Sequence, residues 1–221
     1  MGYNSGMDFY HVINRGVEKR TTFVEDGDYV RFIHDMYLFN DTRNAPNFIV
    51  KERQSLRKRD VLVRIHAFCL MPNHYHLLLS PAKEGGLSLF MRKLNMGYAK
   101  YFNEKYERSG VLWQGTFRRQ QVTRDAHFLY IPYYIHMNPL DLKFPHWRAG
   151  NVHDAKGAED YLLHYRWSSH CDYLNIPNFQ SVLYQPELRS LFRSTEKYRE
   201  ELRGIMANPA RAGESTMIEP I

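Results

Sequence analysis

The sequence is poor in cysteine and has no long apolar run. Its two cysteines, Cys69 and Cys171, lie far apart and form no C-x-x-C pair, so we expect reduced, buried thiols. No apolar stretch approaches the roughly 18 residues that a membrane-spanning helix needs. Residues 1–16 also lack the charged start and the apolar run of a signal peptide. These absences predict a soluble protein of the cytoplasm.

The composition is that of a folded, basic protein. Of the 221 residues, 43% are hydrophobic and 14% aromatic, which is enough for one large domain or one domain with an extension. Charged residues make up 24%, close to the globular average, which argues against extensive disorder. The formal net charge of +6 favours a polyanionic partner, although charge alone does not identify nucleic acid as that partner.

The first part of the chain alternates between strand and helix patterns. Residues 9–15 alternate and carry aromatic and β-branched residues, which predicts a strand. Apolar residues in 29–37 recur with the spacing of an amphipathic helix. Two β-prone runs, 61–71 and 74–80, flank a Pro-Asn turn and predict a hairpin.

The next segments complete a recognisable order of elements. The patterns predict a second amphipathic helix over 87–102, a strand over 112–122 and a third helix over 125–137. Strand, helix, strand, strand, helix, strand is the order of the split β-α-β of ferredoxin-like folds. We therefore expect an α+β fold, an antiparallel sheet with helices packed on one face, followed by a helical C-terminal extension. Residues 185–206 are expected to be charged and mostly exposed.

A histidine pair lies in the second strand of the predicted hairpin. His74 and His76 are two residues apart, so their side chains leave the same face of the strand. Their Cα atoms would lie roughly 6.5–7 Å apart, which lets two imidazoles converge on one metal ion. Tyr75 points to the other face. With 11 histidines in the chain, a chance pair is the alternative interpretation.

A second pair of polar residues lies on the third predicted helix. Tyr134 and Asn138 are four residues apart and share a helix face that could point toward the histidines. Asn138 offers a carbonyl oxygen, which suits Mg²⁺ or Mn²⁺. Tyr134 offers a phenol, which is a nucleophile once deprotonated. The alternative interpretation is that Tyr134 is one of 16 tyrosines and fills the core.

Five motifs occur in an order that indicates a known family. They are residues 10–16 (YHVINRG), 71–78 (MPNHYHLL), 112–115 (LWQG), 134–139 (YIHMNP) and 166–169 (RWSS). In this order the chain resembles the single-tyrosine HUH transposases. Among these it resembles the REP-associated tyrosine transposases more than the compact insertion-sequence enzymes. The resemblance covers about residues 9–175.

The resemblance implies an active site and a reaction. His74 and His76 match the HUH pair, Tyr134 matches the nucleophile, and Asn138 matches the residue that completes the metal site. In the family, the tyrosine attacks a DNA phosphodiester, forms a 5′-phosphotyrosine and releases a 3′-hydroxyl, and the reverse step rejoins strands. Mg²⁺ or Mn²⁺ is the implied cofactor. Single-stranded DNA, with a hairpin or palindromic repeat, is the implied partner of this nucleoid-associated enzyme.

The resemblance also implies an organisation of the chain. Residues 1–150 correspond to the catalytic domain, and residues 151–221 to a helical C-terminal extension that ends in a flexible tail. Compact relatives act as homodimers and REP-associated relatives as monomers, so both states remain open for this chain.

One residue departs from the family pattern. Pro132 lies two residues before Tyr134, and a proline inside a helix removes a hydrogen bond and bends the helix. The helix either begins near Pro132, with Tyr134 in its first turn, or bends there. Tyr130 and Tyr133 are therefore alternative nucleophiles.

Several basic and aromatic residues are candidates for binding DNA. Arginines bind phosphates, and aromatic rings stack on unpaired bases. The segment around the fourth predicted strand contributes Trp113, Phe117, Arg118 and Arg119, and the first strand contributes Arg15. Residues 51–64 hold six basic and two acidic side chains, and the candidates there are Lys51, Arg53, Arg57, Lys58 and Arg59. A core tryptophan with a solvated arginine pair, and a solvated basic loop, are the alternatives.

Two other functions are compatible with the same residues. A relative that binds DNA hairpins without cutting them would keep the basic surface but would not need the four site residues. A zinc hydrolase would use the histidine pair with a third ligand, for which His66, His136 and Cys69 are the candidates.

Overall fold

A four-stranded antiparallel sheet lies at the centre of the structure, a computed structural model that describes residues 7–43, 59–123, 125–150 and 152–208. Its strands are β1 (Tyr10–Arg15), β2 (Val63–Met71), β3 (His74–Pro81) and β4 (Arg118–Gln121). Their order across the sheet is β2-β3-β1-β4, and every neighbouring pair is antiparallel. This order is that of a split β-α-β, so the predicted α+β, ferredoxin-like class is confirmed.

The register of β1 against β3 decides which side chains share a face. Arg15 pairs with His74, and Ile13 pairs with His76. Paired residues of an antiparallel ladder point to the same side of the sheet, and neighbours along a strand point to opposite sides. His74 and His76 therefore lie on one face, together with the side chains of Ile13 and Arg15, and Tyr75 lies on the other face.

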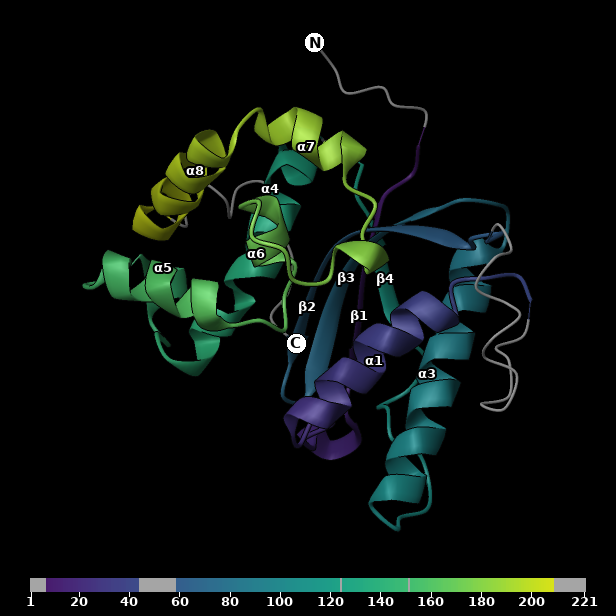
Figure 1. Cartoon of the computed structure of the whole chain (residues 1–221). Coiled ribbons are helices and arrows are strands. Elements are labelled where there is room, and N and C mark those ends of the chain that lie inside the picture. Colours follow the sequence, from purple (N-terminus) through teal and green to yellow (C-terminus); the bar gives the residue numbers. More distant parts are fainter. Residues whose placement is uncertain (1–6, 44–58, 124, 151, 209–221) are drawn as a thin grey trace.

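Two helices cover the face of the sheet that carries Tyr75 (Figure 1). They are α1 (Asp26–Leu38) and α3 (Gly86–Lys105). Tyr75 is fully buried among their apolar side chains, and its hydroxyl donates a hydrogen bond to Asn95 Oδ1 on α3 at 2.7 Å. A capping box formed by Glu25 and Asp28 begins α1. Both helices match the predicted amphipathic segments.

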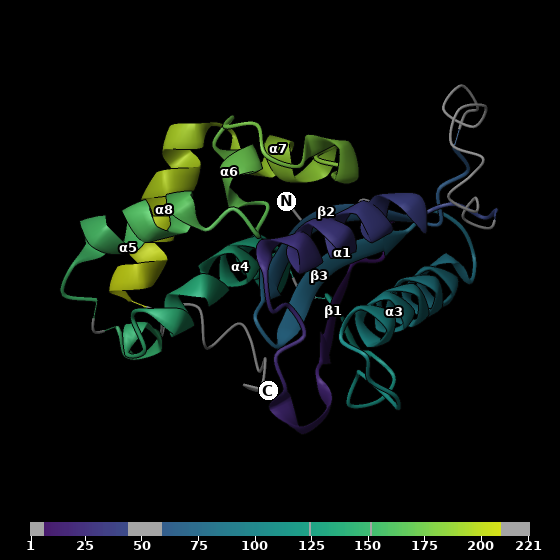
Figure 2. The same ribbon diagram turned by 60° about the horizontal axis from the view of Figure 1, so that its bottom comes forward.

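The opposite face of the sheet is covered as well, by α4 (Asp125–Met137), which packs on β2 and β3. Ala67, Cys69 and Leu78 from these strands share a second core with α4. Figures 1 and 2 show α1 and α3 together on one side of the sheet, and α4 with the C-terminal helices on the other. The expectation that the helices pack on one face is therefore wrong. The almost wholly apolar sequence of α4 explains why it is buried between two layers.

The C-terminal part of the chain consists of short helices that pack against α4. They are α5 (Ala155–His164), α6 (His170–Tyr173), α7 (Pro186–Phe192) and α8 (Thr195–Ala207). Short 3-10 segments are η1 (Val17–Lys19), η3 (Asn138–Leu142), η4 (Trp147–Ala149) and η5 (Gln180–Val182). Tyr198, Leu202 and Met206 of α8 are buried in the second core, although most residues of 185–206 are exposed, as expected. The predicted tail from residue 211 lies outside the described residues.

The C-terminal helices share one core with α4, while the division of the chain at residue 150 stays a prediction. Among the described helices, none is both long and apolar enough to cross a membrane.

The fourth strand is shorter than the predicted strand over 112–122. The backbone N–H of Gln114 still bonds the Arg15 carbonyl at 2.8 Å, and strand pairing resumes only at Ile13 with Arg118. Between these two points β1 contributes one residue, Asn14, while the other segment contributes residues 115–117. The longer segment bulges away from β1, and Gly115 at its start makes that bend easy.

A buried polar network joins α4 to three other parts of the chain. The Tyr198 hydroxyl of α8 bonds Nδ1 of both His136 and His170, each at 2.8 Å. His136 Nε2 bonds Ser169 Oγ at 2.7 Å, and that hydroxyl accepts the backbone N–H of Phe68 on β2 at 2.9 Å. The network therefore holds α4, α6, α8 and β2 in one arrangement.

Removing the Tyr198 hydroxyl should weaken the fold measurably. In Tyr198→Phe, the imidazoles of His136 and His170 lose their shared partner inside the protein, so we expect the free energy of unfolding to fall by about 1–3 kcal/mol. Urea unfolding curves measure this through a lower midpoint with an unchanged slope. Tyr37→Phe, at a position 40% exposed, is the control and should change stability by less than about 0.5 kcal/mol. Equal midpoints for the two variants would show that the network does not stabilise the fold.

Candidate active site

The two strand histidines lie side by side on the face of the sheet that α4 covers. Their ring centroids are 5.0 Å apart. His74 Nδ1 bonds Asn73 Oδ1 at 2.7 Å, so this nitrogen carries the ring proton and Nε2 keeps its lone pair. His76 Nδ1 bonds His11 Nε2 at 3.0 Å. His76 Nε2 is buried and has no hydrogen-bond partner among the described residues.

Both histidines are held in the neutral form. Burial lowers the pKa of His74 to about 4, and the positive charge of Arg15 adds to this effect. Burial also lowers the pKa of His76 to well below its usual value, with smaller contributions from the neighbouring histidines. A neutral imidazole has the lone pair that a metal ion requires. The site therefore presents two imidazoles in the protonation state of metal ligands.

Tyr134 is the tyrosine that α4 brings to this pair. Its ring lies edge-on to His11 and His76, with centroid distances of 5.8 Å to each. Tyr133 instead stacks on Tyr198 at 5.1 Å, inside the second core. Tyr130 lies 6.2 Å from the Tyr134 ring, and no ring contact with the histidines is found for it among the described residues. Of the three candidate nucleophiles, Tyr134 is the one that the structure brings to the histidines.

The helix that carries Tyr134 runs through Pro132 without ending. It spans Asp125–Met137, so Tyr134 lies in its last turn rather than its first. The interpretation that the helix begins near Pro132 is therefore wrong. Packing on both sides holds this helix together despite the missing proline N–H.

Asn138 follows directly after α4 and is bonded on both sides of its amide. Its Nδ2 donates to the Tyr134 carbonyl at 2.8 Å, and its Oδ1 accepts from Arg148 Nη2 at 3.1 Å. The structure thus brings Asn138 next to Tyr134. Its oxygen is bonded to Arg148, so it could bind a metal ion only after Arg148 releases it.

Arg148, in η4, is a site residue that the sequence patterns did not indicate. Its guanidinium lies 5.1 Å from the centroid of the Tyr134 ring and pairs with Asp141 at 2.7 Å. Burial raises the pKa of Tyr134, and the charge of Arg148 opposes that rise. Ten residues separate Arg148 from Asn138, across a 3-10 turn and a loop, so no helical or strand period connects them.

Among the described residues, no third zinc ligand for a hydrolase joins the histidine pair. Within the described ranges, no three His, Cys, Asp or Glu side chains gather closely enough to hold a metal ion. His66 bonds Ser80 Oγ at 2.7 Å, and both nitrogens of His136 belong to the Tyr198 network. Cys69 pairs with His76 in the ladder, but burial raises the pKa of its thiol well above the usual value.

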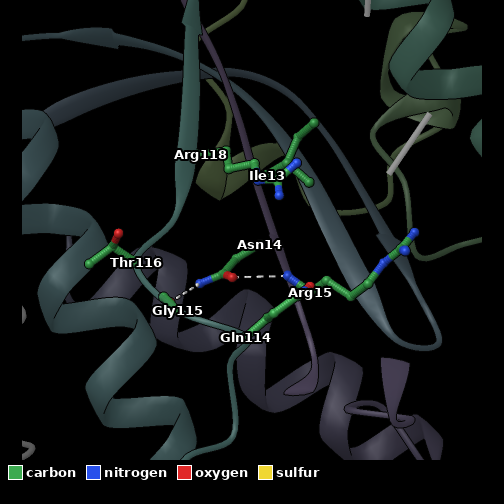
Figure 3. A pocket seen from close by; sticks show the side chains of 7 residues that line it. All are labelled: Ile13, Asn14, Arg15, Gln114, Gly115, Thr116 and Arg118. Atoms are coloured by element: carbon green, nitrogen blue, oxygen red, sulfur yellow. Dashed lines mark hydrogen bonds between the residues drawn. The ribbon is translucent and has the colours of Figure 1, made fainter. Parts of the chain in front are cut away.

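The first strand and the start of β4 border a small pocket of about 150 Å³. It is lined by Ile13, Asn14, Arg15, Gln114, Gly115, Thr116 and Arg118. Figure 3 shows the Asn14 amide directed to the Gly115 carbonyl, whereas the Arg15 side chain extends away from that segment. Two of the predicted DNA-binding arginines, Arg15 and Arg118, therefore lie at one pocket.

The adjacent arginines of β4 lie on opposite faces of the sheet. Arg118 pairs with Ile13, on the face of the histidines, and Arg119 pairs with Val12, on the face of α1 and α3. The Arg119 guanidinium lies 5.8 Å from the centroid of the Tyr10 ring. Although both side chains are exposed, only Arg118 shares a face with Tyr134.

The aromatic candidates belong mainly to the core. Trp113 is 7% exposed, its indole N–H donates to the Asn95 carbonyl at 3.1 Å, and its ring lies 5.3 Å from that of Tyr75. Because its faces are covered, Trp113 is not part of the DNA-binding surface that we propose below. Phe117 is partly buried against the same core.

One member of the basic run has a contact that explains its position. The Arg59 guanidinium donates to the backbone carbonyls of Tyr37 and Asn40 and lies 3.8 Å from the centroid of the Tyr37 ring. It therefore binds the C-terminal end of α1. The other candidates of this run, Lys51, Arg53, Arg57 and Lys58, lie outside the described residues.

Known proteins resemble part of this chain. No curated protein matches the chain. Among solved structures, the chain is similar to one described as "Structure of the REP associates tyrosine transposase bound to a REP hairpin", with 15% sequence identity and a TM-score of 0.44, covering 65% of this chain and 73% of that chain. Residues 47–138 match the family model described as "Transposase IS200 like". This stretch, which contains both strand histidines and Tyr134, is similar to the IS200-like transposases.

Proposed function

We propose that this chain is a transposase that cleaves and rejoins single-stranded DNA through a tyrosine–phosphate bond, with a divalent metal ion. The observation that carries the proposal is the position of Tyr134. Its ring meets His76 edge-on at 5.8 Å, beside a buried imidazole nitrogen that has no partner among the described residues. A core tyrosine would need no such neighbour. The family match over residues 47–138 supports the same reaction class.

The proposed reaction exchanges one phosphoester bond for another. The Tyr134 oxygen attacks the phosphorus of a DNA phosphodiester and forms a 5′-phosphotyrosine, while the bond to the 3′ oxygen breaks. The phenol loses its proton, and the departing oxygen gains one to become a 3′-hydroxyl. A strand with a free 3′-hydroxyl reverses the step and joins the ends. Because the phosphotyrosine is an ester like the bond it replaces, no ATP is needed.

The residues present fit a divalent metal ion. His74 and His76 offer neutral imidazoles, and Asn138 offers an amide oxygen, a donor that suits Mg²⁺ or Mn²⁺. When bound, such an ion neutralises charge on the non-bridging phosphate oxygens. Asn73 and His11 bond the other nitrogen of each histidine ring and so hold the two rings in place.

Arg148 is proposed to assist Tyr134. Its cation lies against the phenol ring, where it favours loss of the proton and stabilises the charge that develops during attack. Arg148 also bonds Asn138 Oδ1, so metal binding and release of this bond are coupled. Once released from Asn138, the guanidinium is free to bind the scissile phosphate while Asp141 still holds it.

The substrate is proposed to be single-stranded at the cleaved bond. Tyr134 is only 7% exposed and belongs to the core shared by α4 and the sheet, so little of its side chain is accessible to a phosphate. A flexible single strand can approach such a side chain more closely than a rigid duplex. The motif resemblance favours a flanking hairpin or palindromic repeat as the recognised element, with the enzyme a monomer or a homodimer.

A DNA-binding protein that does not cut is the second candidate function. The bond between Arg148 and Asn138 Oδ1 favours it, because this bond occupies the oxygen that a metal ion would need. Such a protein would bind hairpin DNA in the presence of EDTA and would cleave it with no metal ion.

Tyr134→Phe should abolish the covalent intermediate. With a labelled single-stranded oligonucleotide that carries a hairpin, and with Mn²⁺, we expect the wild-type chain to form an adduct that survives denaturing electrophoresis. The phenylalanine variant lacks the attacking oxygen and should form none. Tyr133→Phe, at the neighbour that stacks on Tyr198, is the control and should keep the adduct. An adduct formed by Tyr134→Phe would refute the assignment of the nucleophile.

Mn²⁺ should stabilise the folded chain through the histidine pair. A ligand that binds only the native state adds about 2.7 kcal/mol of stability at 100 times its dissociation constant, which raises the melting temperature. We expect this rise in the wild-type chain and in His34→Ala, an exposed position on α1, but not in His76→Ala. A rise that persists in His76→Ala would place the metal ion elsewhere.

Arg148→Gln should slow adduct formation without unfolding the chain. Loss of one charged donor next to developing negative charge lowers a rate by roughly 100-fold. The matched control is Arg166→Gln, because each arginine lies over the tryptophan beside it, Arg148 over Trp147 at 4.5 Å and Arg166 over Trp167 at 4.9 Å. Trp167, however, belongs to the core on the other face of the sheet. Single-turnover kinetics of the two variants at saturating Mn²⁺ measure the difference. Equal rates would remove Arg148 from the mechanism.

A further inference from the structure

Part of the histidine-bearing face of the sheet extends beyond α4. The helix packs mainly on β2 and β3 and reaches His11 on β1 through Tyr134, while the rest of β1 and β4 continue the same face toward the sheet edge. On this part lie Arg15, opposite His74, and Arg118, opposite Ile13. Arg118 is exposed, and Ile13 between the two strands is buried. This part of the face therefore carries two cations around the buried Ile13.

Neither arginine pairs with a carboxylate in the part of the chain that the structure describes. None of the ion pairs within the described ranges includes Arg15 or Arg118. The Nε of Arg15 is buried and has no hydrogen-bond partner among the residues that the structure describes. The pKa of Arg15 is lowered, first by burial and then by the positive charge of Arg118, so the two guanidinium groups are close enough to repel each other. Two like charges without a counterion form a binding site for an anion.

The position of these cations relative to Tyr134 indicates which anion they bind. Arg15 begins at the pocket beside Arg118, and its charge acts on both His74 and His76. The cations thus continue from the pocket to the histidine pair along one face of the sheet. A strand of phosphates that lies along this face would contact Arg118 and Arg15 beside the site of Tyr134.

We propose that Arg15 and Arg118 form a phosphate subsite for the backbone of single-stranded DNA, next to the scissile phosphate and on the face of Tyr134. This inference rests on the proposed function for the identity of the strand. The subsite reads no base, because its charged groups recognise phosphates only. The proposal gives the two β4 arginines different roles: Arg118 binds the DNA strand, and Arg119, on the opposite face of the sheet, does not.

The adjacent arginines provide a matched pair of variants. Binding of a fluorescein-labelled single-stranded DNA of roughly 16 nucleotides is measured by anisotropy with the full chain, in EDTA and over a range of salt concentrations. We expect Arg118→Gln and Arg15→Gln each to weaken binding roughly tenfold. Each should also reduce the steepness of the salt dependence by about 0.7, the value for one phosphate contact on a single strand. Arg119→Gln should match the wild-type chain in both quantities.

A further variant separates charge from folding. Arg15 is half-buried, so Arg15→Gln is accompanied by Arg15→Lys, which keeps the charge and should recover most of the affinity lost. Melting curves show whether each variant is folded. A loss that Arg15→Lys does not recover, in a folded chain, would contradict the role of its charge.

Three results would overturn the subsite. They are an equal loss in Arg118→Gln and Arg119→Gln, no loss in either, and no binding by the wild-type chain. Equal sensitivity with a duplex of the same sequence would contradict the single-strand assignment. The adduct assay is independent of these measurements. If Arg118→Gln weakens DNA binding, Arg119→Gln does not, and no adduct forms, the subsite stands and the proposed cleavage is refuted. If an adduct forms but the two variants bind DNA equally well, the cleavage stands and the subsite is refuted.

Discussion

The packing of α4 across β2 and β3 is the constraint on which the candidate site depends. Without it, the histidine pair would lie on an open sheet, and Tyr134 would have no fixed position relative to His76. The helix is apolar on nearly all sides because it is buried between the sheet and the C-terminal helices. The hydroxyl of Tyr198 fixes the orientation of α4, since it forms hydrogen bonds with both His136 on α4 and His170 on α6. The C-terminal helices therefore help to position the site, although none contributes a residue to it.

The charges around the candidate site favour the binding of an anion. The histidines are neutral because burial lowers their pKa, so they add no charge of their own. Positive charge comes from Arg15 and Arg118 on the sheet and from Arg148 beside Tyr134. Asp141 pairs with Arg148 and offsets that cation in part. Cations with so few partners suit a phosphodiester, which supplies the missing negative charge.

The bond between Arg148 and Asn138 connects the two halves of the site. In this structure the guanidinium holds the amide oxygen, and the amide nitrogen holds the Tyr134 carbonyl. Asn138 is therefore a brace for the end of α4 at the same time as it is a candidate metal ligand. The proposed cleavage requires it to change partners, whereas a protein that only binds DNA would have no reason to change them.

Local pattern alone was enough to determine most of the elements and one half of the site. Strand alternation placed His74 and His76 on one face and Tyr75 on the other, and the spacing of apolar residues predicted α4 with its observed bounds. Such patterns record which side of its own element a residue faces, because side-chain direction follows from the backbone period. They contain no information on what is packed against that side.

Tertiary structure alone decided the rest. The second helical layer, the burial of Trp113, the contact of Arg148 with Tyr134 and the opposite faces of Arg118 and Arg119 all depend on contacts between distant segments. The register of β4 against β1 could not be inferred, because the bulge at residues 115–117 shifts the pairing and no repeating pattern in the sequence marks that bulge. The sequence by itself thus determined the strand of His74 and His76 and the helix of Tyr134, and packing decided how they meet.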